Sequence, residues 1–365
     1  MKKQDGFVQK IIVIIIPMIC VLGWLLYFGM HRVETEEHGA SITVLNYGDY
    51  IEREVLSDFE EQTGIHVVYE EYETPETMYA KYKSKSISYD LICTSEYMIE
   101  KLISEDEVLP IHPQNIPNLS YIDEKYYSIV DAFDPDRSYT VPYFLGTVGL
   151  LYNTKAVDPK DVKSWSALWM EKYKNQIIME NSVRDCLIPA FCLQGRSINA
   201  TDQPSLDEAL ALLEEQKRLN YAYLSDDAMY EMIMENANMA LIYSGEANAA
   251  KLQNENLAYS VPKEGSNLWM DAWFVPKTCT HQKEAEAFLD FLCDPEVAYQ
   301  NWDYVYYTTP NVGVYEMLDK EDQEDRTMFP SEEVLERCEV FHALPDEDMR
   351  RYNDLWKQLK VYYAK

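Results

Sequence analysis

Residues 41–69, SITVLNYGDYIEREVLSDFEEQTGIHVVY, contain a strand pattern, a helix pattern and a second strand pattern in succession. The flanking runs SITVL and IHVVY are rich in the β-branched and apolar side chains that strands favour. Between them, Val55 and Phe59 share one face of a helix, and Gly64 is expected to end it because glycine readily adopts the left-handed conformation. A strand–helix–strand unit of this kind predicts a mostly parallel sheet covered by helices.

The alternation of strand and helix patterns continues along the rest of the chain. A buried third strand is predicted at residues 89–94 (YDLICT), and a second region of the same kind begins near Gly146. Further strands and helices are predicted at residues 78–85, 148–152, 176–179, 205–219, 239–243, 272–275 and 284–292. The chain is therefore predicted to form two α/β lobes, and ligands of such sheets bind beyond the carboxyl ends of the strands.

Polar and aromatic side chains concentrate around the ends of these predicted strands. They are Tyr47, Asp49, Tyr50, Ser95, Tyr97, Ser182, Asp185, Glu246, Trp269, Asp271 and Tyr307. For each of them alone, packing or helix capping explains its position at least as readily as ligand binding does. Together, they predict a site lined by carboxylates and aromatic rings.

The N-terminal part of the chain has the pattern of a membrane segment. Residues 11–30 form an apolar run without a charge, and at about 1.5 Å per residue such a helix spans about 30 Å, the thickness of a bilayer core. Lysines precede the run and acids follow it, so the positive-inside rule places residues 1–10 in the cytoplasm. An uncleaved anchor fits best, because no small-residue cleavage site follows and Ile19 precedes Cys20. A cleaved signal peptide and lipidation at Cys20 stay open, and all three readings place the globular part outside the cytosol.

The composition excludes several classes of function. The formal net charge of −31 repels nucleic acid and anionic lipid and concentrates cations, although surface acids also serve solubility. The sequence contains no GxSxG, HExxH, P-loop or GxGxxG motif. Its six histidines and seven cysteines lack the spacing of metal ligands. We therefore expect no enzymatic activity, no metal and no cofactor.

Several strings of the chain occur in the same order as in a known family. They are NYGDY (46–50), YETPETMYAKYKS (72–84), YDLICTSEYMIEKL (89–102), YTVPYFLGTVGLLYN (139–153), AVDPKDVKSWSALW (156–169), VPKEGSNLWMDAWFVP (261–276) and YYTTPN (306–311). From about residue 41 to its C-terminus, the chain thus resembles the spermidine/putrescine-binding proteins of polyamine ABC transporters.

The resemblance implies a type II periplasmic-binding-protein-like fold, an α/β architecture of two lobes joined by a hinge. We expect lobe one at residues 41–146 and 270–315, and lobe two at residues 147–269 and 316–365. Residues 1–32 are then the cytoplasmic N-terminus with the transmembrane anchor or signal segment, and residues 33–40 are a tether.

The resemblance also implies a polyamine pocket that can be transferred position by position. Its residues are Tyr47, Asp49, Tyr50, Ser95, Tyr97, Ser182, Asp185, Tyr243, Trp269, Asp271 and Tyr307. Tyr47 and Tyr243 stand where the family has Trp, and Ser182 stands where it has an acid. Glu96 and Glu180 are candidates to supply the missing charge.

A polyamine is a flexible methylene chain that carries ammonium groups, so it needs carboxylates for its charges and flat apolar walls for its methylenes. The resemblance therefore implies the substrate-binding subunit of an ABC importer for putrescine or spermidine. The protein would lie at the outer face of the cytoplasmic membrane, and its partners would be the permease and the ATPase of the importer. The alternatives are a binding protein of the same fold for another cationic or amine solute, and a membrane-tethered sensor.

Overall fold

The computed structural model, which describes residues 39–362, confirms the predicted N-terminal strand–helix–strand unit. β1 (Ser41–Tyr47) pairs in parallel with β2 (His66–Tyr72), and α2 (Arg53–Thr63) connects the two strands. Gly64 follows α2 in the left-handed conformation, at φ 72°, as its position in the sequence predicts.

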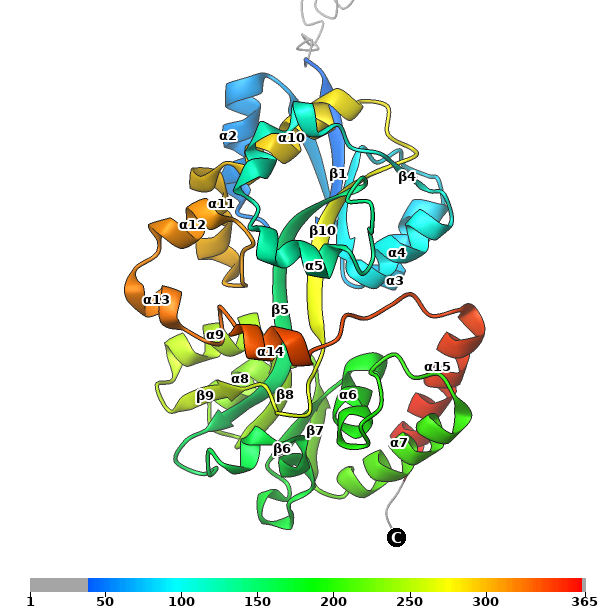
Figure 1. Ribbon diagram of the computed structural model, residues 1–365, viewed down its shortest axis with the longest axis vertical. Helices are drawn as coiled ribbons and strands as arrows, with labels where there is room; N and C mark the ends of the chain where they lie inside the picture. Colours follow the sequence, from blue (N-terminus) through cyan, green and yellow to red (C-terminus); the bar gives the residue numbers. More distant parts are fainter. Residues whose placement is uncertain (1–38, 363–365) are drawn as a thin grey trace, which may run out of the picture.

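The half of the molecule that contains this unit is lobe one. The third predicted strand, β3 (Leu91–Ser95), lies parallel to β1, and all its residues are buried. Helices lie on either side of the sheet (Figure 1). They are α3 (Pro75–Lys83), α4 (Glu96–Ser104), α5 (Tyr127–Val130), α10 (Gln282–Cys293), α11 (Pro295–Val305) and α12 (Val312–Met317).

Lobe two contains a second parallel set, in which β6 (Ile177–Glu180) lies between β7 (Asn220–Leu224) and β8 (Met239–Tyr243). Its helices are α6 (Val183–Leu193), α7 (Gln203–Gln216), α8 (Asp227–Ile233), α9 (Ser244–Gln253) and α15 (Asp346–Val361). Shorter elements complete the chain: β4 (Val108–Leu109), β9 (Leu257–Ser260), α13 (Lys320–Glu324) and α14 (Glu332–Arg337).

Two long strands, β5 (Thr140–Asn153) and β10 (Leu268–Pro276), connect the lobes and pair antiparallel with each other (Figure 1). The strand order is β2-β1-β3-β10-β5-β8-β6-β7. β10 is antiparallel to β3, and β5 is antiparallel to β8 and β9. The prediction of a mostly parallel sheet is therefore wrong at the centre, because the predicted strands at 148–152 and 272–275 are parts of these longer connecting strands.

The predicted borders of the lobes fall within the connecting strands. Gly146 of β5 pairs with Trp269 of β10, so the expected borders lie opposite each other in the ladder. The division of residues between the lobes stays a prediction. The apolar run at 11–30 and residues 33–38 of the tether lie outside the described residues. Within residues 39–362, no helix is both long and apolar enough to span a bilayer.

The two faces of β10 belong to different parts of the core. Met270 and Phe274 lie in one hydrophobic cluster, and Trp269 and Trp273 lie in another, as alternation along a strand requires. Asp271 stands between the two tryptophans on their face of the strand, and it is buried like the rest of β10. This strand thus brings a carboxylate into an otherwise apolar face.

We expect Trp273→Ala to lower the free energy of unfolding by about 3–5 kcal/mol, because it removes a large side chain from a packed core. The Trp273 ring is fully buried and lies 5.2 Å from that of Tyr143 and 6.4 Å from that of Phe288, between centroids. Urea denaturation measures the change. Val68→Ala, at a residue that is 42% exposed, is the control and should cost less than about 0.5 kcal/mol. Equal losses in the two variants would contradict this account of the core.

Candidate functional site

Strand ends from both lobes meet at the connecting strands. Tyr47 ends β1 and Ser95 ends β3 in lobe one, and Tyr243 ends β8 in lobe two. Trp269 and Asp271 of β10 link the side chains at these ends through the contacts described below. The inter-lobe site is the connected set Tyr47, Tyr50, Ser95, Ser182, Asp185, Tyr243, Trp269, Asp271 and Tyr307.

Asp271 is the acid at the lobe-one end of the inter-lobe site. The Tyr50 hydroxyl donates to its Oδ2 at 2.8 Å, and the Tyr47 hydroxyl donates to its Oδ1 at 3.4 Å. The residue is 8% exposed, and this burial raises the pKa of its carboxyl to about 7, although the two phenols oppose the rise. Ser95 pairs with Asp271 between β3 and β10, and its hydroxyl is buried without a hydrogen-bond partner in the described part of the chain. Asp271 thus offers a buried carboxyl beside an uncommitted hydroxyl.

Asp185 is the corresponding acid at the lobe-two end. Its Oδ2 accepts hydrogen bonds from the Ser182 hydroxyl at 2.5 Å and from the Tyr243 hydroxyl at 2.8 Å. Burial raises the pKa of the Asp185 carboxyl, and these two donors oppose the rise. Ser182, at a position where the resemblance implies an acid, therefore acts as a donor to the neighbouring Asp185.

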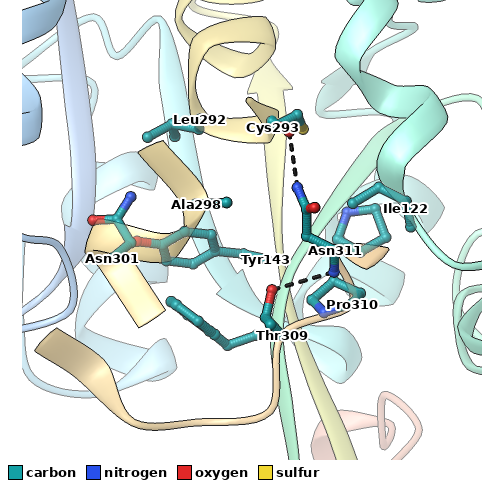
Figure 2. Close-up of a pocket in the computed structure, with 11 residues that line it drawn as sticks. Ile122, Tyr143, Leu292, Cys293, Ala298, Asn301, Thr309, Pro310 and Asn311 are labelled. Atoms are coloured by element: carbon teal, nitrogen blue, oxygen red, sulfur yellow. Dashed lines mark hydrogen bonds between the residues drawn. The ribbon is translucent and has the colours of Figure 1, made fainter. Parts of the chain in front are cut away.

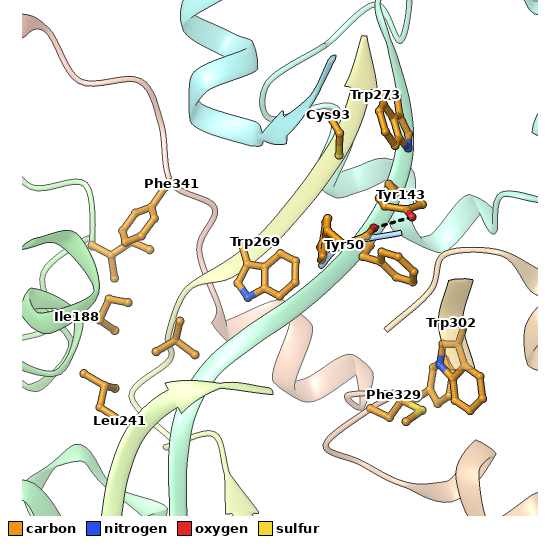
Figure 3. Close-up of a cluster of buried hydrophobic side chains, with 14 of the residues drawn as sticks. Tyr50, Cys93, Tyr143, Ile188, Leu241, Trp269, Trp273, Trp302, Phe329 and Phe341 are labelled. Atoms are coloured by element: carbon orange, nitrogen blue, oxygen red, sulfur yellow. Dashed lines mark hydrogen bonds between the residues drawn. The ribbon is translucent and has the colours of Figure 1, made fainter. Parts of the chain in front are cut away.

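Aromatic rings join the two acids. The Trp269 ring meets that of Tyr307 edge to face at 5.0 Å and that of Tyr243 at 6.2 Å, between centroids. Tyr307 in turn lies 5.9 Å from Tyr50. Figure 3 shows Trp269 and Tyr50 beside the connecting strands, between the apolar groups of the two lobes. A continuous aromatic path thus runs from the phenols around Asp271 to those around Asp185.

Three further acids lie near the inter-lobe site. Glu96 is 1% exposed and accepts from the Met270 N–H at 3.2 Å, and burial raises its pKa to about 8. Burial raises the pKa of Glu180 to about 9, and the charges of Asp185 and Glu246 add to this rise. Burial also raises the pKa of Glu246, although part of its side chain is exposed. The sequence analysis indicates Glu96 and Glu180 as candidates for the charge that is missing at position 182. Glu246 is noted in the sequence only because it follows a predicted strand.

Two predicted pocket residues make other contacts. Asp49 is exposed in a turn at φ 51°, where partial burial and the charge of Asp49 raise the pKa of Tyr304 in α11. The Tyr97 hydroxyl donates to Glu76 at 3.1 Å, and the Tyr97 ring lies 5.4 Å from the Arg184 guanidinium. The structure therefore leaves Asp49 and Tyr97 outside the connected set, and their place in a ligand pocket stays a prediction.

A small cavity lies in lobe one, and none of these acids lines it (Figure 2). Its volume of about 20 Å³ is room for about one water molecule. In its wall, the Asn311 side chain donates to the carbonyl of Cys293 at 2.8 Å, and the Asn311 N–H donates to Thr309 at 3.2 Å. This cavity is too small to hold an organic solute.

Comparison with known proteins finds relatives over most of the chain. Residues 54–330 match the family described as bacterial extracellular solute-binding protein. The spermidine/putrescine-binding periplasmic protein of Salmonella typhimurium is 31% identical over 320 residues, which are 87% of this chain and 90% of that protein. The putrescine-binding periplasmic protein SpuD of Pseudomonas aeruginosa is 26% identical over 333 residues, which are 87% of this chain and 91% of that protein.

Solved structures have the same fold. The spermidine/putrescine ABC transporter substrate-binding protein PotD of Streptococcus pneumoniae superimposes with a TM-score of 0.80 at 36% identity, over 89% of this chain and 99% of that chain. A protein of Listeria monocytogenes named for spermidine/putrescine ABC transport superimposes with a TM-score of 0.81 at 34% identity, over 89% of this chain and 100% of that chain. These likenesses confirm the predicted two-lobed α/β fold.

Asp271→Asn should make the ligand-free protein more stable at alkaline pH. Since the pKa of Asp271 rises from 3.8 to about 7 on folding, the folded state holds a proton that the unfolded state loses, and wild-type stability falls as the pH rises through this interval. The variant has no carboxyl at this position, so its stability does not fall in this way. Its advantage in free energy of unfolding should grow by about 2 kcal/mol between about pH 5 and about pH 8, as measured by urea denaturation. An advantage that stays constant over this range would show that the carboxyl is already ionised.

Proposed function

This chain belongs to the bacterial extracellular solute-binding proteins, and we propose that it captures a polyamine between its lobes and delivers it to the permease and ATPase of an ABC importer. Membership of this family confirms the expectation that the chain is not an enzyme. The observation that carries the proposal is the pair of buried acids, Asp271 and Asp185, joined by the aromatic path of the inter-lobe site.

The two acids and the rings between them suit a ligand in which methylenes separate ammonium groups. An ionised, buried carboxylate forms strong charge-assisted hydrogen bonds with an ammonium group. Trp269 and Tyr307 supply apolar contact along the methylenes and cation–π attraction of about 0.5–2 kcal/mol per good contact. A neutral solute would leave the acids buried without a cation, which is costly. The named ligands of the relatives, spermidine and putrescine, support the same solute class.

The serine at position 182 does not deprive lobe two of negative charge. Ser182 donates to Asp185, and Glu180 lies close enough for the charge of Asp185 to raise its pKa. In this proposal, Glu180 supplies the charge that the acid at position 182 supplies elsewhere in the family. Putrescine and spermidine then both fit the number of acids.

Binding of the amine is coupled to the arrangement of the two lobes. A multiply charged amine neutralises acids of both lobes at once, so it stabilises a closed arrangement over an open one. The relatives are periplasmic, which supports a location outside the cytoplasm. In this proposal, residues 11–30 keep the protein at the outer face of the cytoplasmic membrane, near the permease.

Asp271→Asn and Trp269→Ala should each weaken binding of the preferred amine at least about tenfold, because one removes a buried ion pair and the other an aromatic wall. Calorimetry with putrescine, cadaverine, spermidine and spermine measures the affinities. Asp354→Asn, which makes the same change at a side chain that is 67% exposed, should keep the wild-type affinity. Unchanged affinity in both site variants would reject the pocket, and a wild-type protein that binds none of the amines would reject the function.

Amine binding at about pH 7 should release protons. Burial raises the pKa of Glu96 to about 8 and that of Glu180 to about 9, so both hold protons in the free protein and lose them when a cation arrives. The calorimetric enthalpy should then depend on the ionisation enthalpy of the buffer, and this dependence should shrink as the pH is raised. A binding enthalpy that is the same in all buffers at neutral pH would show that these acids do not change their protonation on binding.

A further inference from the structure

Residues 338–345, which join α14 to α15, form a crossing segment that passes between the lobes (Figure 1). Lobe two binds this segment from the loop between α6 and α7, where Asn199 donates to the carbonyl of Val340 at 2.9 Å and accepts from the His342 N–H at 2.9 Å. Arg184 of α6 donates to the carbonyl of His342 at 2.8 Å. These three hydrogen bonds fix the crossing segment to lobe two just before α15 begins.

Glu100 of α4 binds the same segment from lobe one. Its Oε2 accepts from the Ala343 N–H at 2.6 Å, and Nδ1 of His342 lies 3.3 Å from both of its carboxylate oxygens. Lys101 and Asp346 also pair across the lobes at 3.2 Å, but the Asp346 side chain is 80% exposed, and such a surface pair contributes little. The Glu100 side chain is 31% exposed, and a carboxylate that accepts from a backbone N–H forms a charge-assisted hydrogen bond. Of these contacts, the bond from Ala343 to Glu100 should therefore stabilise the arrangement of the lobes most.

The helix α4 connects this bond to the inter-lobe site. Ser95, a member of the site, is the N-cap residue of α4 and pairs with Asp271 between β3 and β10. Glu96 and Glu100 are four residues apart, so they lie on the same face of the helix, and Glu96 accepts from the Met270 N–H of β10 at 3.2 Å. A bond that keeps Glu100 against the crossing segment therefore also keeps the site end of α4 close to lobe two.

We propose that Glu100 is a positioning residue that stabilises the closed arrangement of the lobes and so strengthens the binding of every amine by the same factor. This inference rests on the proposed function, in which the ligand is taken up between the lobes. Opening the lobes separates α4 from the crossing segment and breaks the bond from Ala343, whereas closing them forms it. Because apparent affinity scales with the fraction of the protein in the binding-competent arrangement, a contact that favours closure raises affinity without touching the ligand.

The test compares Glu100→Ala with Glu105→Ala in the full chain. Glu105 directly follows α4, has a side chain that is 29% exposed, and bonds to Tyr79 and Lys83 of α3 in the same lobe. In calorimetry, Glu100→Ala should weaken putrescine and spermidine binding alike by about tenfold, the equivalent of about 1.4 kcal/mol. Glu105→Ala should change either affinity by less than about twofold. Glu100→Gln keeps an acceptor for the Ala343 N–H without the charge, so its affinities should lie between those of the wild type and Glu100→Ala.

Two further measurements separate closure from a general loosening of the fold. In stopped-flow experiments, faster dissociation should account for the loss in Glu100→Ala, because the amine enters an open arrangement that lacks the bond. In the ligand-free protein, Glu100→Ala should speed hydrogen exchange of the backbone N–H groups in residues 338–345 by about threefold or more. Glu105→Ala should exchange there at the wild-type rate.

Asn199→Ala keeps the test independent of the folding of Glu100→Ala. It removes two of the hydrogen bonds that fix the crossing segment to lobe two, so it should also weaken all amines by one factor. Once the segment is released from lobe two, Glu100 no longer joins the lobes, and the double variant should bind within about twofold of the weaker single variant.

The inference is overturned if Glu100→Ala leaves the affinities unchanged, if it alters the ratio of spermidine to putrescine affinity, or if its loss lies in the association rate. Losses that multiply in the double variant would overturn it as well, and so would wild-type exchange of residues 338–345 in ligand-free Glu100→Ala. A wild-type protein that binds no amine would instead overturn the proposed function, while the exchange measurement would still show whether Glu100 fixes the crossing segment.

Discussion

The antiparallel ladder between β5 and β10 is the constraint on which the rest of the structure depends. Its backbone hydrogen bonds belong to strands that connect both lobes, so the relation between the lobes does not rest on a few side chains. The alternation along β10 then places Trp269 and Asp271 on one face, where the strand ends of both lobes converge. Gly146, opposite Trp269, is required here, because a Cβ at this position would approach the indole to 2.5 Å.

The carboxylates beside this ladder are buried, and this burial has two opposite effects. In the ligand-free protein, burial disfavours the ionised form of Asp271 and Glu96, so part of the folding free energy is spent on holding these groups out of water. The same burial strengthens the attraction to any cation that enters, because solvent screens it poorly. Stability of the free protein and affinity for a cation therefore have opposite requirements at these positions.

Tyr47 and Tyr243, at positions where the resemblance implies Trp, contribute more than aromatic surface. The hydroxyls of Tyr47 and Tyr243 donate to Asp271 and Asp185, respectively. Each tyrosine therefore has less apolar surface than a tryptophan would have, and its phenol O–H lies where it favours the ionised acid. Ser182 acts in the same way on Asp185. The three departures from the family pattern thus share one physical effect, which the residue types alone do not reveal.

Local patterns predicted β1, β2, β3, β6 and β8 of the two parallel sets, because propensity, periodicity and a terminating residue such as Gly64 act over a few residues. They did not predict β7, which completes the parallel set of lobe two. They were not sufficient for the full extent of β5 and β10, since strands buried along their whole length carry no alternation of polar and apolar residues. All nine residues of the inter-lobe site are among the eleven that the resemblance implies, and their role in ligand binding stays a prediction. Which phenol contacts which acid depends on packing between distant segments, since Tyr50 and Asp271 are 221 residues apart in the chain. For the same reason, the exposed position of Asp49 and the contact of the Tyr97 ring with the Arg184 guanidinium emerged only from the tertiary structure.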